Sequence, residues 1–293
     1  MNPEPPYLVA IMNPGSCLCG DLRYETAGPF DLMAHCHCSM CRKHHGAMFA
    51  TFLSAPLEGF RWISGQEQVV VYRSSDQGHR PFCPRCGSVA PMIMRDMGLV
   101  FLLAGNLEHD PGVRPQMHIF ADSRASWYPI TGDLPQHAAF PPGFGGGAGV
   151  ARPAPDPKPG ITQGSCLCNG TAWEFTGRPE RVQNCHCSRC RRARSAAHAT
   201  NAFYRQDQLT WTRGRENVVS FALPGAKRFG QDFCGRCGSP VPRVVSSTGY
   251  VVVPCGSLDS PLEKGPLGHI FTGSKAPWFE ITDGLPQWEA LPA

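Results

Sequence analysis

The chain has 293 residues, 15 of them cysteine, and a formal net charge of +4 that is too small to indicate a partner by itself. Its hydrophobic content of 42% is that of an ordinary globular protein, and its length favours two modest domains. No apolar run approaches the ~20 residues of a membrane helix, and residues 7–12 lack the flanks of a leader peptide, so we expect a soluble cytoplasmic protein with no membrane partner.

The sequence contains a duplication. Segments 15–19 (GSCLC) and 36–41 (CHCSMC) recur 149 residues later, and segment 82–88 (FCPRCGS) recurs 151 residues later. Residues 118–136 align without gaps to residues 269–287 and match at 11 of 19 positions. Because order, spacing and sequence agree, we interpret the chain as two copies of one unit.

A stretch rich in Gly, Pro and Ala separates the copies and cannot bury a core. We therefore predict a first domain over residues 1–139, a linker over 140–160 and a second domain over 161–293.

Short strands are the main elements that the sequence predicts. Brief β-branched or aromatic runs bounded by turn residues cover residues 68–73, 99–104, 217–222 and 250–254. No segment keeps a helical apolar period for three turns, and we expect only short helical turns over 42–45 and 191–194. The prediction is a mainly β fold braced by metal.

The cysteines divide into seven per copy plus one. In a reducing compartment, clustered cysteines at regular spacing indicate metal ligation or thiol chemistry. In each copy a Cys-x-Cys and a Cys-x-x-Cys together offer four thiolates, the closed donor set of a structural zinc. These sets are Cys17, Cys19, Cys83, Cys86 and Cys166, Cys168, Cys234, Cys237. Reduced thiols without metal are the alternative. Cys255 is left over, and we interpret it as a small buried hydrophobe.

The middle three cysteines of each copy predict a different kind of site. They are Cys36, Cys38, Cys41 and Cys185, Cys187, Cys190. Three protein ligands leave the fourth position of zinc for water or substrate, which is typical of a catalytic site. A thiol substrate bound there would be held as a thiolate, which suits thiol–aldehyde chemistry.

Histidines near the first triplet leave an alternative open. His35, His37, His44 or His45 could complete a structural Cys3His site. We expect His37, which lies between two ligands, to point away from the metal and to act as a positioning residue or as a general acid or base.

The motifs resemble the glutathione-dependent formaldehyde-activating (GFA) family, also called the centromere protein V/GFA domain, over nearly the whole chain and twice. The resemblance rests on segments 15–20, 36–47 and 82–87, and on Trp127 with the later Gly-x-Leu-Pro of residues 132–135. It implies the Mss4-like zinc-bound β fold, up to two zinc ions per domain on the cysteine sets above, and a carbon–sulfur lyase that joins glutathione and formaldehyde to S-(hydroxymethyl)glutathione.

Two positions depart from the pattern, since Ser195 replaces the glycine found at Gly46, and Asn169 lies before Gly170 where the first copy has Cys19-Gly20. The first copy fits the family better. We therefore expect Cys36, Cys38 and Cys41 to bind the substrate thiol through zinc, with His37 or His44 moving the proton.

Several basic and aromatic residues have two interpretations. Arg189, Arg191, Arg192 and Arg194 could clamp the carboxylates of a glutathione-like ligand, contact nucleic-acid phosphates or form a solvated face. Arg42 and Arg191 are the candidate substrate-binding residues. We interpret His118, Trp127 and their repeats His269 and Trp278 as packing residues rather than substrate contacts. The alternative function is a catalytically silent zinc scaffold or an interaction module.

Overall fold

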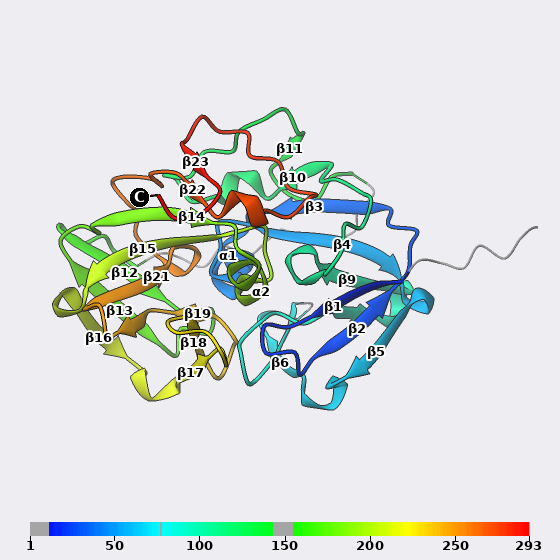
Figure 1. Ribbon diagram of the computed structural model, residues 1–293, viewed down its shortest axis with the longest axis horizontal. Helices are drawn as coiled ribbons and strands as arrows, with labels where there is room; N and C mark the ends of the chain where they lie inside the picture. The colour runs from blue at the N-terminus through cyan, green and yellow to red at the C-terminus, as the bar shows by residue number, and fades with distance from the viewer. Residues whose placement is uncertain (1–11, 77, 143–154, 293) are drawn as a thin grey trace, which may run out of the picture.

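The computed structural model describes residues 12–76, 78–142 and 155–292. The chain is mainly β, with two similar halves that lie side by side (Figure 1). The predicted linker lies largely outside the described residues, since only 140–142 and 155–160 of it are described.

Each half contains a three-stranded and a six-stranded sheet. In the first half the small sheet has the order β1 (Asn13–Ser16), β2 (Arg23–Thr26), β5 (Phe60–Ser64). The large sheet has the order β11 (Gln136–His137), β10 (Met117–Ile119), β3 (Leu32–Cys36), β4 (Ala50–Pro56), β9 (Leu99–Leu103), β8 (Met92–Met94). A hairpin of β6 (Val70–Arg73) and β7 (His79–Phe82) completes this half.

The second half repeats this arrangement. Its small sheet is β12 (Ile161–Ser165), β13 (Ala172–Thr176), β16 (Leu209–Arg213). Its large sheet is β20 (Arg243–Val245), β21 (Tyr250–Pro254), β15 (Ala199–Arg205), β14 (Arg181–Cys185), β22 (His269–Ile270), β23 (Gln287–Trp288). Strands β17 (Val218–Ala222), β18 (Gly230–Cys234) and β19 (Pro240–Val241) form its third sheet.

The predicted strands differ from the observed ones by a residue or two at their ends. Strand β21 has the predicted bounds, β6 and β17 begin later than predicted, and β9 ends at Leu103 because a 3-10 turn begins at Ala104.

The helices α1 (Ser39–His45) and α2 (Ser188–Arg194) begin three residues earlier than predicted. In each, the sulfur of the cysteine before the helix accepts a hydrogen bond from the backbone of the third residue, which caps the first turn.

The helix of each half packs against the other half. Helix α1 contacts the turn at 255–257, and α2 contacts the equivalent turn at 104–106. The approach is close enough to require glycine, since a Cβ on Gly105 would lie 2.3 Å from the backbone nitrogen of Ala196. A Cβ on Gly256 would likewise lie 2.3 Å from the carbonyl oxygen of Ala47. One core cluster accordingly contains buried side chains of both halves, and the two halves form one packed body.

A buried ion pair stabilises the interface between the two halves. Lys43 Nζ lies 2.6 Å from Asp259 Oδ1 and donates to the backbone and side-chain oxygens of Ser165 at 2.7 and 2.9 Å. The equivalent pair, Arg192 with Glu108, is longer at 3.5 Å, and about a third of each side chain is exposed.

We expect Lys43→Met to destabilise the protein by about 3–5 kcal/mol, because it leaves the Asp259 carboxylate buried without its cation. Arg192→Met is the matched control and should cost about 0–1 kcal/mol, as expected for a half-exposed pair. Urea unfolding of both variants measures the difference. Equal losses would show that burial does not distinguish the two pairs.

Candidate functional site

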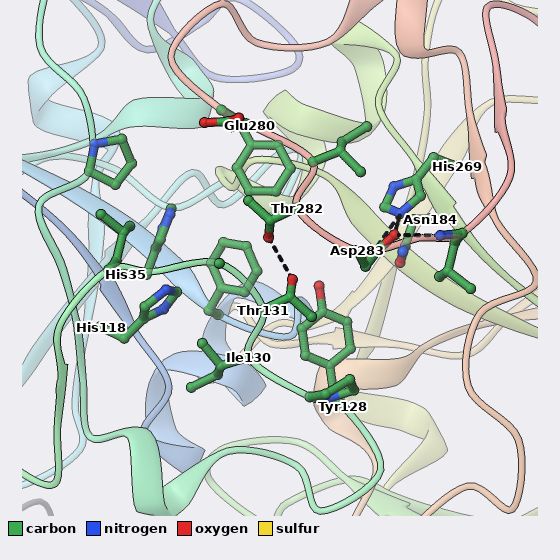
Figure 2. Close-up of a pocket in the computed structure, with 18 of the residues that line it drawn as sticks. His35, His118, Tyr128, Ile130, Thr131, Asn184, His269, Glu280, Thr282 and Asp283 are labelled. Carbon is green, nitrogen blue, oxygen red and sulfur yellow. Dashed lines mark hydrogen bonds and ion pairs between the residues drawn. The ribbon is translucent and has the colours of Figure 1, made fainter.

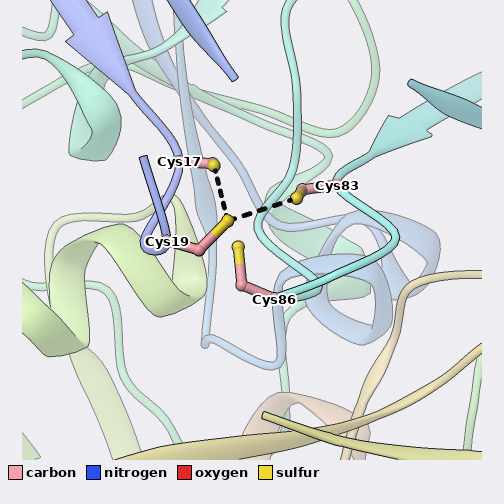
Figure 3. Close-up of side chains that lie close together, drawn as sticks. All are labelled: Cys17, Cys19, Cys83 and Cys86. Carbon is pink, nitrogen blue, oxygen red and sulfur yellow. Dashed lines mark hydrogen bonds between the residues drawn. The ribbon is translucent and has the colours of Figure 1, made fainter. Parts of the chain in front are cut away.

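Two sets of four cysteines lie where the predicted structural sites require them. In each half the first two come from the turn after the first strand. The last two come from the turn after β7 in the first half, and from the end of β18 and the turn after it in the second half. Each residue offers one sulfur, and the four sulfurs of each set lie within 4.8 Å of one another. Figure 3 shows the first set converging on one point from two chain segments.

The sulfur spacing of these sets fits zinc. Cys17 Sγ lies 3.4 Å from Cys19 Sγ, which lies 3.6 Å from Cys83 Sγ. Zinc–sulfur bonds of about 2.3 Å in a tetrahedron place sulfurs about 3.8 Å apart, whereas a disulfide requires about 2.0 Å. In the second set the corresponding distances are 3.4 and 3.7 Å. Backbone amides donate to the sulfurs of Cys17 and Cys166, which supports thiolates there. The donor sets are therefore suited to the metal.

The two triplets also converge, and each contains three sulfurs only. The sulfurs of Cys36, Cys38 and Cys41 lie within 4.8 Å of one another, as do those of Cys185, Cys187 and Cys190. Within the described residues no histidine joins either group. A Cys3His site is thus not formed, and both triplets keep the incomplete donor set that the sequence predicts.

The surroundings of the two triplets differ. All three cysteines of the first triplet are buried, whereas Cys187 and Cys190 are half-buried. Arg80 of β7 donates from Nη1 to Cys41 Sγ at 3.4 Å. Burial opposes its charge, but the thiolates of Cys41 and Cys38 raise the pKa of Arg80. Gln231 has the equivalent position in the second half and is bonded instead to Arg194 and to the carbonyl of Cys86. Among the described residues, only the first triplet has a guanidinium hydrogen-bonded to one of its sulfurs.

The histidines beside the first triplet lie on the other face of the sheet. Strand β10 pairs in parallel with β3, with His118 opposite His35 and Ile119 opposite Cys36. Because side chains alternate along a strand, His35, His37 and His118 share one face, and Cys36 packs with Ile119 on the other. His37 Nε2 lies 2.8 Å from His118 Nδ1. The His37 ring thus points away from the sulfurs, as expected for a residue that lies between two ligands.

A cavity of about 890 Å³ lies between the halves on this second face. Figure 2 shows His35 and His118 at one end and His269 with Asp283 at the other. Loops 127–134 and 278–285 line it and meet where Thr131 Oγ1 lies 2.5 Å from Thr282 Oγ1. His118, Trp127, His269 and Trp278, interpreted from the sequence as packing residues, all line this cavity. One indication of this was present in the sequence, since all four residues are repeated between the copies. Duplication alone, however, also explains their repetition.

The predicted arginine residues are largely engaged within the protein. Arg42 donates to the carbonyl oxygens of His37 and Ser123 at 3.3 and 3.1 Å. The equivalent Arg191 has a buried Nε with no partner among the described residues and lies half-buried near Cys187. Arg194 is buried and bonded to Gln231 and Asn201. The four arginines after Ser188 thus form neither one solvated face nor a continuous basic patch, since Arg189 is exposed, Arg191 and Arg192 are half-buried and Arg194 is buried.

The remaining sequence features have structural explanations. His44 Nδ1 lies 3.2 Å from the carbonyl oxygen of Cys237, so this ring is tied to the other half. Asn169 and Ser195 adopt positive φ angles of 59° and 49°, the conformation of the equivalent Gly20 and Gly46, so both departures keep the local backbone. Cys255 is 1% exposed, which agrees with its interpretation as a buried hydrophobe.

None of the described helices is long and apolar enough to cross a membrane.

Comparison with known proteins gives a family match for both halves. The model of a family described as "glutathione-dependent formaldehyde-activating enzyme" matches residues 12–123 and 161–274. The search of curated proteins found no match. Among solved structures, a Rhodobacter sphaeroides protein is similar at 24% identity and a TM-score of 0.29, over 34% of this chain and 91% of that one. That likeness is too limited to support any inference.

Proposed function

The chain belongs to the glutathione-dependent formaldehyde-activating family, and we propose that it is a zinc-dependent carbon–sulfur lyase acting on thiol–aldehyde adducts. In the direction of synthesis, the sulfur of a thiol such as glutathione attacks the carbonyl carbon of an aldehyde such as formaldehyde. A carbon–sulfur bond forms, the carbonyl π bond breaks, and the oxygen becomes a hydroxyl. The reverse reaction releases the aldehyde and the thiol.

The observation that carries the proposal is the first triplet, with three converging sulfurs, no fourth protein ligand among the described residues and a guanidinium beside it. Zinc bound by three thiolates would supply a fourth position at which a substrate thiol is held as a thiolate.

Arg80 supports this chemistry through its charge. Three thiolates already exceed the charge of a divalent ion, and a substrate thiolate adds a further negative charge in a buried place. A cation 3.4 Å from Cys41 Sγ offsets that excess. Because Gln231 replaces it in the second half, we assign turnover to Cys36, Cys38 and Cys41.

The chain's imidazoles are not assigned the proton transfer. The His37 ring lies on the opposite face, and His44 and His45 are each bonded to a carbonyl oxygen of the second half. We assign to solvent water both the removal of the thiol proton and the protonation of the new hydroxyl. The carboxylates of a substrate at the first triplet are assigned to Arg42. Arg191 is its repeat near the second triplet and has a buried Nε without a partner among the described residues.

We expect Arg80→Gln to lower kcat/KM for adduct formation about 10- to 100-fold, because a charge-assisted contact to the thiolates contributes roughly 1.5–3 kcal/mol. Exchange NMR of glutathione and formaldehyde with their adduct measures the rate. Arg85→Gln is the control, since that side chain is exposed and paired with Asp21.

A wild-type protein with full zinc that does not accelerate this exchange would contradict the proposed activity. An active wild type with an equally active Arg80→Gln variant would contradict only the role of Arg80.

A further inference from the structure

The cavity between the halves is not used by the proposed reaction. It lies on the face of the β3–β10 pair opposite the triplet, so a molecule inside it faces imidazoles rather than sulfurs. At about 890 Å³ it has the size of a small-molecule site, and both halves contribute to its walls. Because of the duplication, an equivalent pair of histidines lies at each end of the cavity, and the hydrogen bonds of the two pairs can be compared.

In the second half the pair is completed by a carboxylate. His269 Nε2 lies 3.0 Å from both oxygens of Asp283, and His269 Nδ1 lies 2.8 Å from His186 Nε2. A carboxylate accepts hydrogen bonds, so His269 carries its proton on Nε2 and its Nδ1 accepts from His186. The chain of donors runs from His186 through His269 to Asp283.

In the first half the carboxylate is missing. His37 and His118 make the same 2.8 Å contact, but Gly132 has the position equivalent to Asp283. The neighbouring Asp133 is exposed and makes no hydrogen bond to His118. His118 is 7% exposed and lines the cavity, and its Nε2 has no partner among the described residues. By the same order of donors, His118 Nε2 carries a proton and presents this N–H to the cavity, where the atom is not fully buried, unlike His37 Nδ1.

The opposite order is less favourable. If His118 Nδ1 donated to His37, then His37 Nδ1 would carry a proton, and that atom is buried without a partner. A buried N–H without an acceptor costs more than a bare lone pair. Both halves therefore share the arrangement in which Nε2 of the second histidine carries the proton. In the first half this N–H of His118 has room for an acceptor atom in the cavity.

The residues that line the cavity indicate which kind of ligand provides the acceptor atom. Phe49, Trp127, Trp278 and Phe279 give the cavity an apolar, aromatic lining. Asp133, Glu280 and Asp283 are among its lining residues, and its arginine, Arg114, is already paired with Asp110. Negative ligands are disfavoured there, whereas an uncharged acceptor is not.

We propose that this cavity binds an uncharged carbonyl compound with an aromatic or aliphatic body, whose oxygen accepts a hydrogen bond from His118 Nε2. The oxygen lies where Asp283 lies against His269 in the second half. The site is separate from the cysteine triplets and does not depend on the proposed lyase activity.

The experiment uses three probes that share one ring: acetophenone, benzoate and benzylammonium. Calorimetry on the full, zinc-loaded chain without added thiol measures their affinity and stoichiometry. Acetophenone should bind one per chain and more tightly than the other two. His118→Phe should weaken acetophenone about tenfold or more, since its oxygen is then buried without a donor. Asp283→Ala should free His269 Nε2 and raise the stoichiometry from one to two.

Circular dichroism and thermal unfolding establish that each variant is folded. An absence of acetophenone binding at millimolar concentration would overturn the proposal. So would tightest binding of benzylammonium, which would identify an aromatic site for cations. Unchanged acetophenone affinity in folded His118→Phe, together with unchanged stoichiometry in folded Asp283→Ala, would overturn it as well.

Discussion

Replacing Cys38 by serine is expected to abolish turnover of thiol–aldehyde adducts, with a loss of at least about 1000-fold in kcat/KM. The physical reason is the donor set, because two thiolates and a hydroxyl bind zinc more weakly than three thiolates, and an unbound substrate thiol is mostly protonated at neutral pH. Exchange NMR measures the rate, and elemental analysis of the same sample measures zinc. Cys187→Ser is the matched control, since Cys187 is the equivalent residue of the second half.

We expect Cys187→Ser to keep most of the activity, because Gln231 has the position of Arg80 and, among the described residues, no guanidinium is hydrogen-bonded to a sulfur of the second triplet. The reverse result, with Cys38→Ser active and Cys187→Ser inactive, would move the reaction to the second half. The greater exposure of Cys187 and Cys190 would then explain why the reaction takes place at the second triplet. Full activity in both single variants and in their combination would contradict a role for either triplet.

Replacing Cys83 by serine is expected to unfold the protein rather than to impair one step. A structural zinc contributes roughly 10–16 kcal/mol to the folding of a small domain, which is comparable to the whole stability of a typical protein. Because one core cluster contains residues of both halves, we expect the second half to be destabilised together with the first. Thermal unfolding followed by circular dichroism measures the effect.

The control for this variant is Cys255→Ala, which removes a buried cysteine that belongs to none of the four sets. It should leave the zinc content unchanged and cost about 1 kcal/mol, and the equivalent residue of the first half is already an alanine, Ala104. A Cys83→Ser protein as stable as Cys255→Ala would show that the set of four is not what holds the fold.

Some parts of the site could be predicted from the sequence because their signal is local or repeated. The four cysteine sets follow from spacings of two or three residues that occur twice, and the structure brings each set together. The β fold followed from short runs of strand-forming residues. The helices were predicted too short, since the sulfurs of Cys38 and Cys187 cap the first turn, and cysteine is not among the usual capping residues.

Other parts depend on contacts between segments distant in sequence. Arg80 lies in the middle of an ordinary strand, and only the packing of the β6–β7 hairpin places it against Cys41. The cavity requires both halves, and its walls consist of apolar and aromatic residues that a single copy would simply bury. The difference between Gly132 and Asp283 was visible in the alignment, but it acquires meaning only when His118 and His269 are seen at equivalent places.

The most direct test of this account is the number of zinc ions bound by the purified protein. Elemental analysis should find four per chain, falling to three in Cys38→Ser while the fold is kept, because each half provides one set of four and one set of three. Two zinc ions per chain, unchanged in Cys38→Ser, would contradict it, since the triplets would then be metal-free and the protein a zinc-stabilised scaffold.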